Sequence, residues 1–106
     1  MTCKVASFGI GQVIHHRTFN YRGVIFDVDP DFQGSEEWYE KNGGSDHSNR
    51  NEPWYHVLID QDGRVAYVAE RNLEVEPSVE PVEHPLIDNF FVGFTGDAYT
   101  PRQTLN

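Results

Sequence analysis

Two aromatic-rich hairpin patterns constrain the fold of this chain more than any other feature of its sequence. In the first, residues 12–17 and 23–28 are rich in β-branched and aromatic side chains. In the second, residues 54–59 and 64–69 flank Asp62-Gly63, a pair that suits a tight turn with a positive φ. Short strands joined by turns predict a mainly β fold, and in a chain of this length they predict a small β-barrel.

The strand at residues 64–69 is apolar on both of its faces. Because side chains alternate along a strand, Val65, Tyr67 and Ala69 share one face. Ala66 and Val68 share the other face. The barrel core needs only one apolar face, so we expect the second to pack against something outside that core.

A polar segment at residues 31–52 follows the first hairpin and predicts a short helix and a loop. The helix is expected at residues 35–41, since Ser35 is a good N-cap and acidic residues occupy the first turn. Asn42-Gly43-Gly44 ends it. Residues 45–52 then predict a mobile loop, which is long for a domain of this size.

Beyond residue 73 the sequence becomes acidic and proline-rich. Residues 74–83 alternate acids, valines and prolines, a pattern that resists a helix and suits an extended strap along a surface. Aromatic residues then cluster in a polar tail, where they dock on the domain or on another subunit. We expect one domain over residues 1–106, with a barrel core at about residues 8–73 and the acidic strap and aromatic tail at residues 74–106.

Composition sets limits on partners and location. The 106 residues include 17 acidic and 8 basic side chains, a formal net charge of −9, which repels phosphate and anionic lipid. Cys3 is the only cysteine, so an intrachain disulfide is impossible, and no apolar run approaches the roughly 20 residues that span a bilayer. The start of the chain lacks the apolar stretch of a signal peptide. We expect a soluble cytoplasmic protein with no membrane partner.

The histidines and acids of the sequence do not suggest a metal site. His15 and His16 are adjacent, so on a strand they point to opposite faces, and the other histidines lie far apart. Asp27, Asp29 and Asp31 resemble the start of a calcium-binding loop, but the glycine and the final glutamate that such a loop requires are missing. We expect strand-end and turn acids there, with no metal and no cofactor.

Motifs for covalent or phosphate chemistry are also missing from the sequence. Gly9-Ile10-Gly11 precedes a predicted strand rather than a helix, so it does not form a phosphate-binding loop. Cys3 has only Lys4 as a basic neighbour, which gives no reason for an activated thiol. We therefore expect a protein that is not an enzyme and has no catalytic residues.

Basic and aromatic residues gather around the first hairpin and form a candidate DNA-binding surface. The basic candidates are His15, His16, Arg17 and Arg22, with Phe19 and Tyr21 interleaved among them. Basic side chains contact phosphate, and aromatic rings stack on exposed bases. In the alternative, the basic side chains only decorate the hairpin while a ring packs inward, and the acidic net charge favours that alternative.

Aromatic residues of the insert and tail form a candidate partner-binding surface, since tryptophan and tyrosine often anchor interfaces. Two lie in the predicted helix and four in the tail: Trp38, Tyr39, Phe90, Phe91, Phe94 and Tyr99. In a barrel this small, each of these rings is also a natural core residue. The sequence leaves both roles open.

Four motifs occur in a distinctive order along the chain. They are Phe8-x-Ile10-Gly11-Gln12-Val13-x-His15-His16-Arg17, Tyr21-Arg22-Gly23-Val24-Ile25-Phe26-Asp27-Val28-Asp29-Pro30, Pro53-Trp54-Tyr55-His56-Val57-Leu58 and Tyr67-Val68-Ala69-Glu70-x-Asn72-Leu73. Together they resemble the heat-shock protein HspQ family, whose domain is also called the YccV-like or hemimethylated-DNA-binding domain. The resemblance implies an SH3-like β-barrel with a short helical insert, in a cytosolic bacterial protein induced by heat. It also implies a homo-oligomer, expected as a trimer.

The resemblance implies two functions and carries no catalytic residues. The first is that of an adaptor, which binds an ATP-dependent protease of the Lon type and promotes degradation of substrates such as the replication initiator DnaA. The second is binding of hemimethylated DNA near the replication origin. The acidic charge, the strap and the tail favour the adaptor, because extended segments add to a sheet edge or dock in a groove. A purely structural oligomer is the third possibility.

Overall fold

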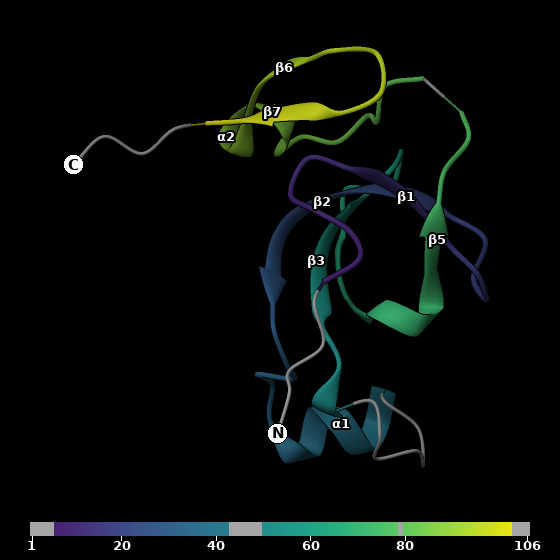
Figure 1. Cartoon of the computed structure of the whole chain (residues 1–106), viewed down its shortest axis with the longest axis vertical. Coiled ribbons are helices and arrows are strands. Elements are labelled where there is room, and N and C mark those ends of the chain that lie inside the picture. Colours follow the sequence, from purple (N-terminus) through teal and green to yellow (C-terminus); the bar gives the residue numbers. More distant parts are fainter. Residues whose placement is uncertain (1–5, 43–49, 79, 103–106) are drawn as a thin grey trace.

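The chain folds into a curled five-stranded sheet with a second, two-stranded sheet against it (Figure 1). The computed structural model describes residues 6–42, 50–78 and 80–102. In chain order its elements are β1 (Val13–His16), β2 (Arg22–Asp29), α1 (Glu36–Asn42), β3 (Trp54–Ile59), β4 (Val65–Ala69), the 3-10 helix η2 (Glu70–Asn72), β5 (Leu73–Val75), α2 (Ile87–Phe90), β6 (Phe91–Phe94) and β7 (Tyr99–Pro101). No helix within these described stretches is long and apolar enough to cross a membrane.

The larger sheet is antiparallel throughout, in the order β4-β3-β2-β1-β5. Its mainly β character confirms the predicted fold class. The closed SH3-like barrel is not found among the described strands, because β4 and β5 remain edge strands. After β4, η2 carries the chain across to β1, where β5 pairs, and this crossing leaves one edge of β4 open.

One face of the sheet curls around an inner core to which all five strands contribute. Its buried members are Ile14, Ile25, Tyr55, Val57, Val68 and Leu73. Phe8 packs edge-on against Tyr55, with 5.6 Å between ring centroids, and the Phe8 N–H donates to the Tyr55 hydroxyl at 3.2 Å. The segment before β1 therefore covers part of the inner core.

The outer face of the sheet is covered by two different parts of the chain. Near α1, the fully buried Tyr39 packs with Trp54 and Ala69. At the other end, the C-terminal segment packs on Val24 and Leu58. In Figure 1 these two covers lie at opposite ends of the molecule, α1 at the bottom and α2, β6 and β7 at the top. Tyr67 and Ala69 on the second apolar face of β4 thus pack outside the inner core, as predicted, while Val65 on the same face is 49% exposed.

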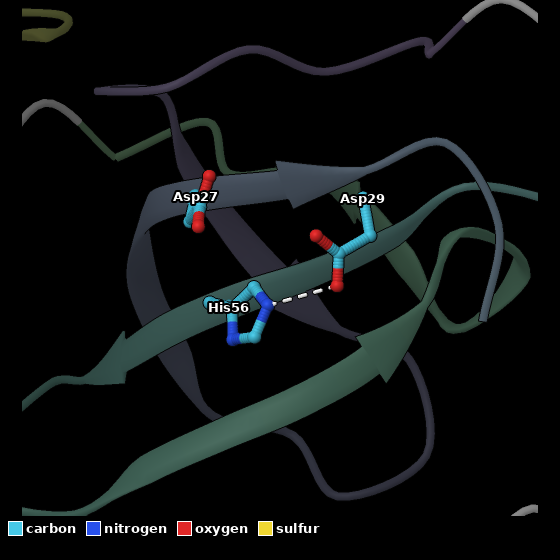
Figure 2. A group of neighbouring side chains, drawn as sticks. All are labelled: Asp27, Asp29 and His56. Atoms are coloured by element: carbon cyan, nitrogen blue, oxygen red, sulfur yellow. Dashed lines mark hydrogen bonds and ion pairs between the residues drawn. The ribbon is translucent and has the colours of Figure 1, made fainter. Parts of the chain in front are cut away.

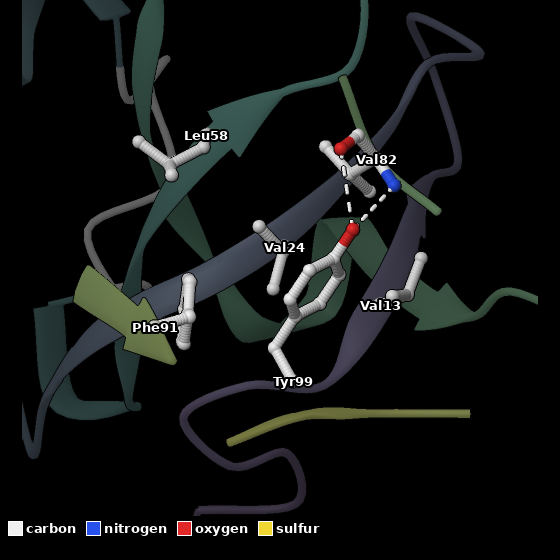
Figure 3. Packing of buried hydrophobic residues seen from close by; sticks show 6 residues of the cluster. All are labelled: Val13, Val24, Leu58, Val82, Phe91 and Tyr99. Atoms are coloured by element: carbon white, nitrogen blue, oxygen red, sulfur yellow. Dashed lines mark hydrogen bonds between the residues drawn. The ribbon is translucent and has the colours of Figure 1, made fainter. Parts of the chain in front are cut away.

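Tyr99 holds the C-terminal segment on the sheet (Figure 3). Its hydroxyl accepts the Val82 N–H at 2.7 Å and donates to the Val82 carbonyl at 3.2 Å. The Tyr99 N–H donates to the Gly11 carbonyl at 2.7 Å. A Cβ on Gly11, whose φ is 94°, would lie 2.1 Å from the Tyr99 carbonyl oxygen, so this close approach requires glycine. The aromatic tail therefore docks on its own domain.

Several local predictions are confirmed. The Ser35 hydroxyl accepts the Trp38 N–H at 3.0 Å, as an N-cap does, and α1 ends at Asn42. A Cβ on Gly23 would lie 2.6 Å from the Leu58 carbonyl oxygen, so the close approach of β3 to β2 requires glycine there. Of the loop predicted at residues 45–52, residues 45–49 lie outside the described part of the chain.

The turn of the second hairpin is longer than the tight turn expected from Asp62-Gly63. Five residues, 60–64, separate β3 from β4, and the Ile59 N–H donates to the Arg64 carbonyl at 3.1 Å. Gly63 has the predicted positive φ, 84°, and Gln61 has a second one, 60°. The backbone bond that closes the hairpin joins Ile59 to Arg64, so the turn is longer than the two residues Asp62-Gly63.

We expect Tyr99→Phe to reduce the free energy of unfolding by about 1–3 kcal/mol, measured by urea denaturation. The substitution keeps the ring but leaves the N–H and carbonyl of the buried Val82 without their partner. Tyr21→Phe is the matched control, since the described residues offer the Tyr21 hydroxyl no hydrogen bond, and its change should stay within about 0.5 kcal/mol. Equal effects of the two substitutions would contradict the role given to the Tyr99 hydroxyl.

Candidate functional site

Between its two covers, the outer face of the sheet carries a cluster of polar side chains. Asp27 and Asp29 come from β2 and His56 comes from β3 (Figure 2), and their nearest oxygen and nitrogen atoms all lie within 4.8 Å of one another. Asp27 is exposed, while the side chains of Asp29 and His56 are 20% and 31% exposed. We call these three residues the Asp-His cluster.

A β-bulge in β2 brings the three residues to one face. Ile25 pairs with Val57 in the inner core, and the next paired residue of β2 is Asp27, opposite His56. Phe26 is the extra residue, and it also lies on the outer face, with its ring 5.7 Å from His56. Without the bulge, Asp27 would share the face of Ile25 and point into the core.

Hydrogen bonds orient the half-buried part of the Asp-His cluster. Asp29 Oδ2 accepts the Tyr67 hydroxyl at 2.7 Å and lies 3.1 Å from His56 Nε2. Burial, and then the bond to Asp29, raise the pKa of Tyr67 well above its ordinary value, so the hydroxyl remains a donor at neutral pH. The His56 ring packs 4.5 Å from the Tyr67 ring. Asp29 and His56 are therefore held in place.

A hollow of about 290 Å³ adjoins the Asp-His cluster on the side of α1. Its lining is Asp29, Gln33, Gly34, Ser35, Trp38, His56 and Tyr67. The Ser35 hydroxyl is engaged as the helix cap, so it is not placed as a nucleophile. What the hollow offers is aromatic walls with one carboxylate and one imidazole at the edge.

A second and larger groove, of about 630 Å³, follows β4 along its open edge. The hydrophobic side chains beside it include Phe19 from the turn of the first hairpin, Trp38 from α1 and Val65 from β4. Phe19 is 73% exposed and Val65 is 49% exposed, which is high for such side chains. We call this feature the β4 groove.

The backbone of β4 presents hydrogen-bonding groups to the β4 groove. Backbone hydrogen bonds join Ile59 to Arg64 and Pro53 to Glu70 at the two ends of the hairpin. These bonds show which residue pairs of the ladder between β3 and β4 are hydrogen-bonded. Because such pairs alternate along an antiparallel ladder, Val65, Tyr67 and Ala69 turn their N–H and carbonyl groups away from β3. These groups point toward the open edge, where another strand can pair.

Two of the predicted DNA-binding residues are tied to one carboxylate. His15 Nδ1 lies 2.8 Å from Glu74 Oε2, and its Nε2 lies 2.7 Å from the Asn20 amide oxygen. Because both ring nitrogens face acceptors, these bonds from Asn20 and Glu74 raise the pKa of His15. Arg17 lies 3.8 Å from Glu74 and also donates to the Leu73 carbonyl at 3.2 Å.

The other two predicted DNA-binding residues have structural roles. His16 is buried, and its Nδ1 accepts the N–H groups of Thr18 and Phe19 at 3.1 and 3.0 Å, which builds the hairpin turn. Burial lowers the pKa of His16. Arg22 donates to Asp60 at 2.9 Å and to the Glu80 carbonyl, so it fastens the strap to the loop after β3. Both side chains are therefore engaged in contacts within the chain.

Every arginine of the chain has an acceptor within the chain, a carboxylate for five of them and a backbone carbonyl for Arg102. The acceptors are Glu74 for Arg17, Asp60 for Arg22, Glu36 for Arg50, Asp62 for Arg64, Glu52 for Arg71 and the Asp88 carbonyl for Arg102. A phosphate backbone must compete with these intrachain acceptors, in a chain whose net charge is already −9.

The predicted partner-binding aromatics divide into two groups. Tyr39, Phe91 and Tyr99 are 0%, 1% and 6% exposed, and as core residues they are not available as surface contacts. Trp38, Phe90 and Phe94 are half-buried, and Trp38 lines both the hollow and the β4 groove. Tyr39 of α1 and Phe91 and Tyr99 of the C-terminal segment pack on the sheet of their own chain, so a partner-binding surface can use only the other three rings.

Sequence reasoning missed the Asp-His cluster and the open edge of β4. From the sequence, Asp27 and Asp29 are expected as strand-end and turn acids, and His56 is expected to lie far from other metal ligands. The spacing of Asp27 and Asp29 on a strand was a usable signal, since residues two apart share a face. No comparable local signal pointed to His56, because it reaches the two acids only through the pairing of β2 with β3 across the insert.

Comparison with known proteins agrees with the motifs. A family model described as "Hemimethylated DNA-binding protein YccV like" matches residues 6–98. The chain belongs to this YccV-like family, which confirms the resemblance to the HspQ family, and the family description names a DNA-binding protein rather than an enzyme.

Similar curated proteins include F-box only protein 21 of Mus musculus, 33% identical over 99 residues, and F-box only protein 21 of Homo sapiens, 32% identical over 99 residues. Each alignment covers 92% of this chain and 16% of the relative. The chain therefore spans only a small part of the length of these relatives.

We expect the pKa of His15 to lie above the ordinary value of 6.5 and the pKa of the adjacent His16 to lie below it. NMR of the ring protons as a function of pH measures both. Glu74→Gln should lower the pKa of His15, because it removes the charged acceptor, and should change that of His16 less, because burial is the main cause of its shift. Since folding lowers the pKa of His16, its stabilising contribution is complete above 6.5 and is lost as the pH falls. A His15 pKa below that of His16 would contradict these contacts.

Proposed function

We propose that this protein is a non-enzymatic adaptor that binds an extended protein segment in the β4 groove. In this role it promotes degradation of substrates, such as the replication initiator DnaA, by an ATP-dependent protease of the Lon type. The observation that carries the proposal is the open edge of β4 beside a groove with exposed apolar side chains. The protease and its substrates come from the resemblance to the HspQ family.

The β4 groove suits an extended segment better than a nucleic acid. Outward N–H and carbonyl groups at Val65, Tyr67 and Ala69 can pair with the backbone of an added strand, and this pairing does not depend on the sequence bound. Phe19 and Val65 then offer apolar contacts to alternate side chains of that strand. The acidic net charge adds a preference for basic segments.

We expect Val65→Pro to abolish the adaptor activity and to keep the fold. Proline removes the Val65 N–H, which points to the groove and makes no ladder bond with β3. The measurement is the degradation rate of purified DnaA by a Lon-type protease, which should fall to the rate without this protein.

Val65→Thr is the matched control, because it keeps the N–H and the branched shape at the same exposed position. It should retain most of the stimulation. Stimulation that survives Val65→Pro in a folded protein would rule out strand addition at β4. Light scattering on both variants tests whether a second copy of this chain, instead of a substrate, occupies the groove. In that case the mass would drop for Val65→Pro and not for Val65→Thr.

Binding of hemimethylated DNA is the second candidate function, and the family description favours it. The side chain best placed for phosphate contact is Arg17, which is 58% exposed and has its closest carboxylate at 3.8 Å. The acids Glu74 and Asp60 beside the other basic candidates oppose such binding.

If this second function holds, a hemimethylated duplex should bind more tightly than fully methylated and unmethylated duplexes of the same sequence. Affinity should fall steeply with salt, and Arg17→Ala should weaken binding to all three duplexes and make the salt dependence shallower. Fluorescence anisotropy at several salt concentrations measures both effects. Equal and negligible binding to the three duplexes at low salt would exclude the function.

A homo-oligomer, with a trimer as the expected form, completes the proposal. Val75 and Val92 are 63% and 61% exposed on the edge strand β5 and on β6, so apolar surface remains outside the β4 groove. Copies joined there would present several β4 grooves to one protease and would raise the effective concentration of bound substrate.

A further inference from the structure

We propose that Asp27, Asp29 and His56 bind one divalent transition-metal ion, and that zinc suits the three donors best. The proposed function makes no use of these side chains, so the inference stands apart from it. Figure 2 shows the three side chains on β2 and β3. The site would lie on the outer face of the sheet, between α1 and the C-terminal cover.

The spacing of the donor atoms is close to that of a metal site. Two ligands at about 2.1 Å from a tetrahedral zinc ion lie about 3.4 Å apart. His56 Nε2 and Asp29 Oδ2 are 3.1 Å apart, and all three donors lie within 4.8 Å of one another. The remaining adjustment falls on the exposed Asp27, whose Oδ1 accepts the Val28 N–H at 2.9 Å, so Oδ2 is the oxygen that turns toward the other two.

The type of donor selects the metal. Imidazole nitrogen suits zinc, nickel, copper and iron, whereas calcium and magnesium prefer sites made only of oxygen. Two carboxylates balance the charge of a divalent ion, and the net charge of −9 raises the local concentration of cations. Three protein ligands leave a coordination position for water or for a donor from a partner.

The surroundings of the donors already have the arrangement of a second coordination shell. The Tyr67 hydroxyl donates to Asp29 at 2.7 Å, and the Gln33 N–H donates to that hydroxyl at 3.0 Å. The His56 ring packs between the rings of Tyr67 and Phe26. Such partners orient metal ligands, and changing them typically costs 10–100-fold in metal affinity.

The bulge in β2 is what places Asp27 in the cluster. A regular strand would turn Asp27 toward the face of Ile25, whereas the bulge places Phe26 and Asp27 together on the outer face. Bulges often re-aim a side chain toward a functional site. Here the re-aimed side chain supplies the third donor, next to a hollow of about 290 Å³ that Asp29 and His56 line.

The test is calorimetric titration of the full chain with zinc chloride, and separately with calcium chloride, at neutral pH. We expect one zinc ion per chain at the cluster and no comparable binding of calcium. Asp27→Asn and His56→Gln should each weaken the zinc affinity at least about tenfold. Zinc should raise the melting temperature of the native chain, and this increase should be absent in the two variants.

Two matched variants separate the cluster from unspecific binding. Glu37→Gln removes an exposed carboxylate of α1, and His84→Gln removes a histidine outside the cluster. Neither should change the zinc affinity. Asp27→Asn decides the outcome, because an exposed isosteric change leaves the sheet folded. Zinc affinity unchanged in this variant, or zinc bound no more tightly than calcium by the native chain, would overturn the proposal.

Discussion

The structure depends on the antiparallel pairing of β2 with β3 at the centre of the larger sheet. Before the bulge, Ile25 and Val57 point together into the inner core. After it, Asp27 and His56 point together to the outer face, which Phe26 also reaches. One added residue therefore decides that the same two strands supply a buried core on one side and a polar cluster on the other.

Hydrogen bonds and ion pairs within the chain occupy the arginine side chains, which limits the surfaces that can bind a partner. The arginines are held by acids or carbonyl groups of the same chain, and Arg22 is used to fasten the strap to the loop after β3. Exposed pairs of this kind add little stability, and a phosphate would have to compete with their acceptors for the same cations. Backbone groups at the edge of β4, and the donors of the Asp-His cluster, are what this domain presents instead.

Much of the local structure follows from the sequence. Alternating β-branched residues predicted β1 to β4, Ser35 predicted the start of α1, and Gly63 predicted a positive φ in the second hairpin. The tail was harder, because clustered aromatic residues suit both a core and an interface. Phe91 and Tyr99 are buried because the outer face of the sheet needs a cover and the tail is long enough to reach it.

The sequence by itself determined the strands, the helix cap, the family and the acidic character, because turn chemistry, two-residue alternation and charge are local or additive properties. Only the tertiary structure decided that β4 keeps an open edge and that His56 meets Asp29, 27 residues away. The physical reason is that strand order and register depend on non-local pairing. A shift of one residue in that pairing would exchange the two faces of β2 without changing any local pattern.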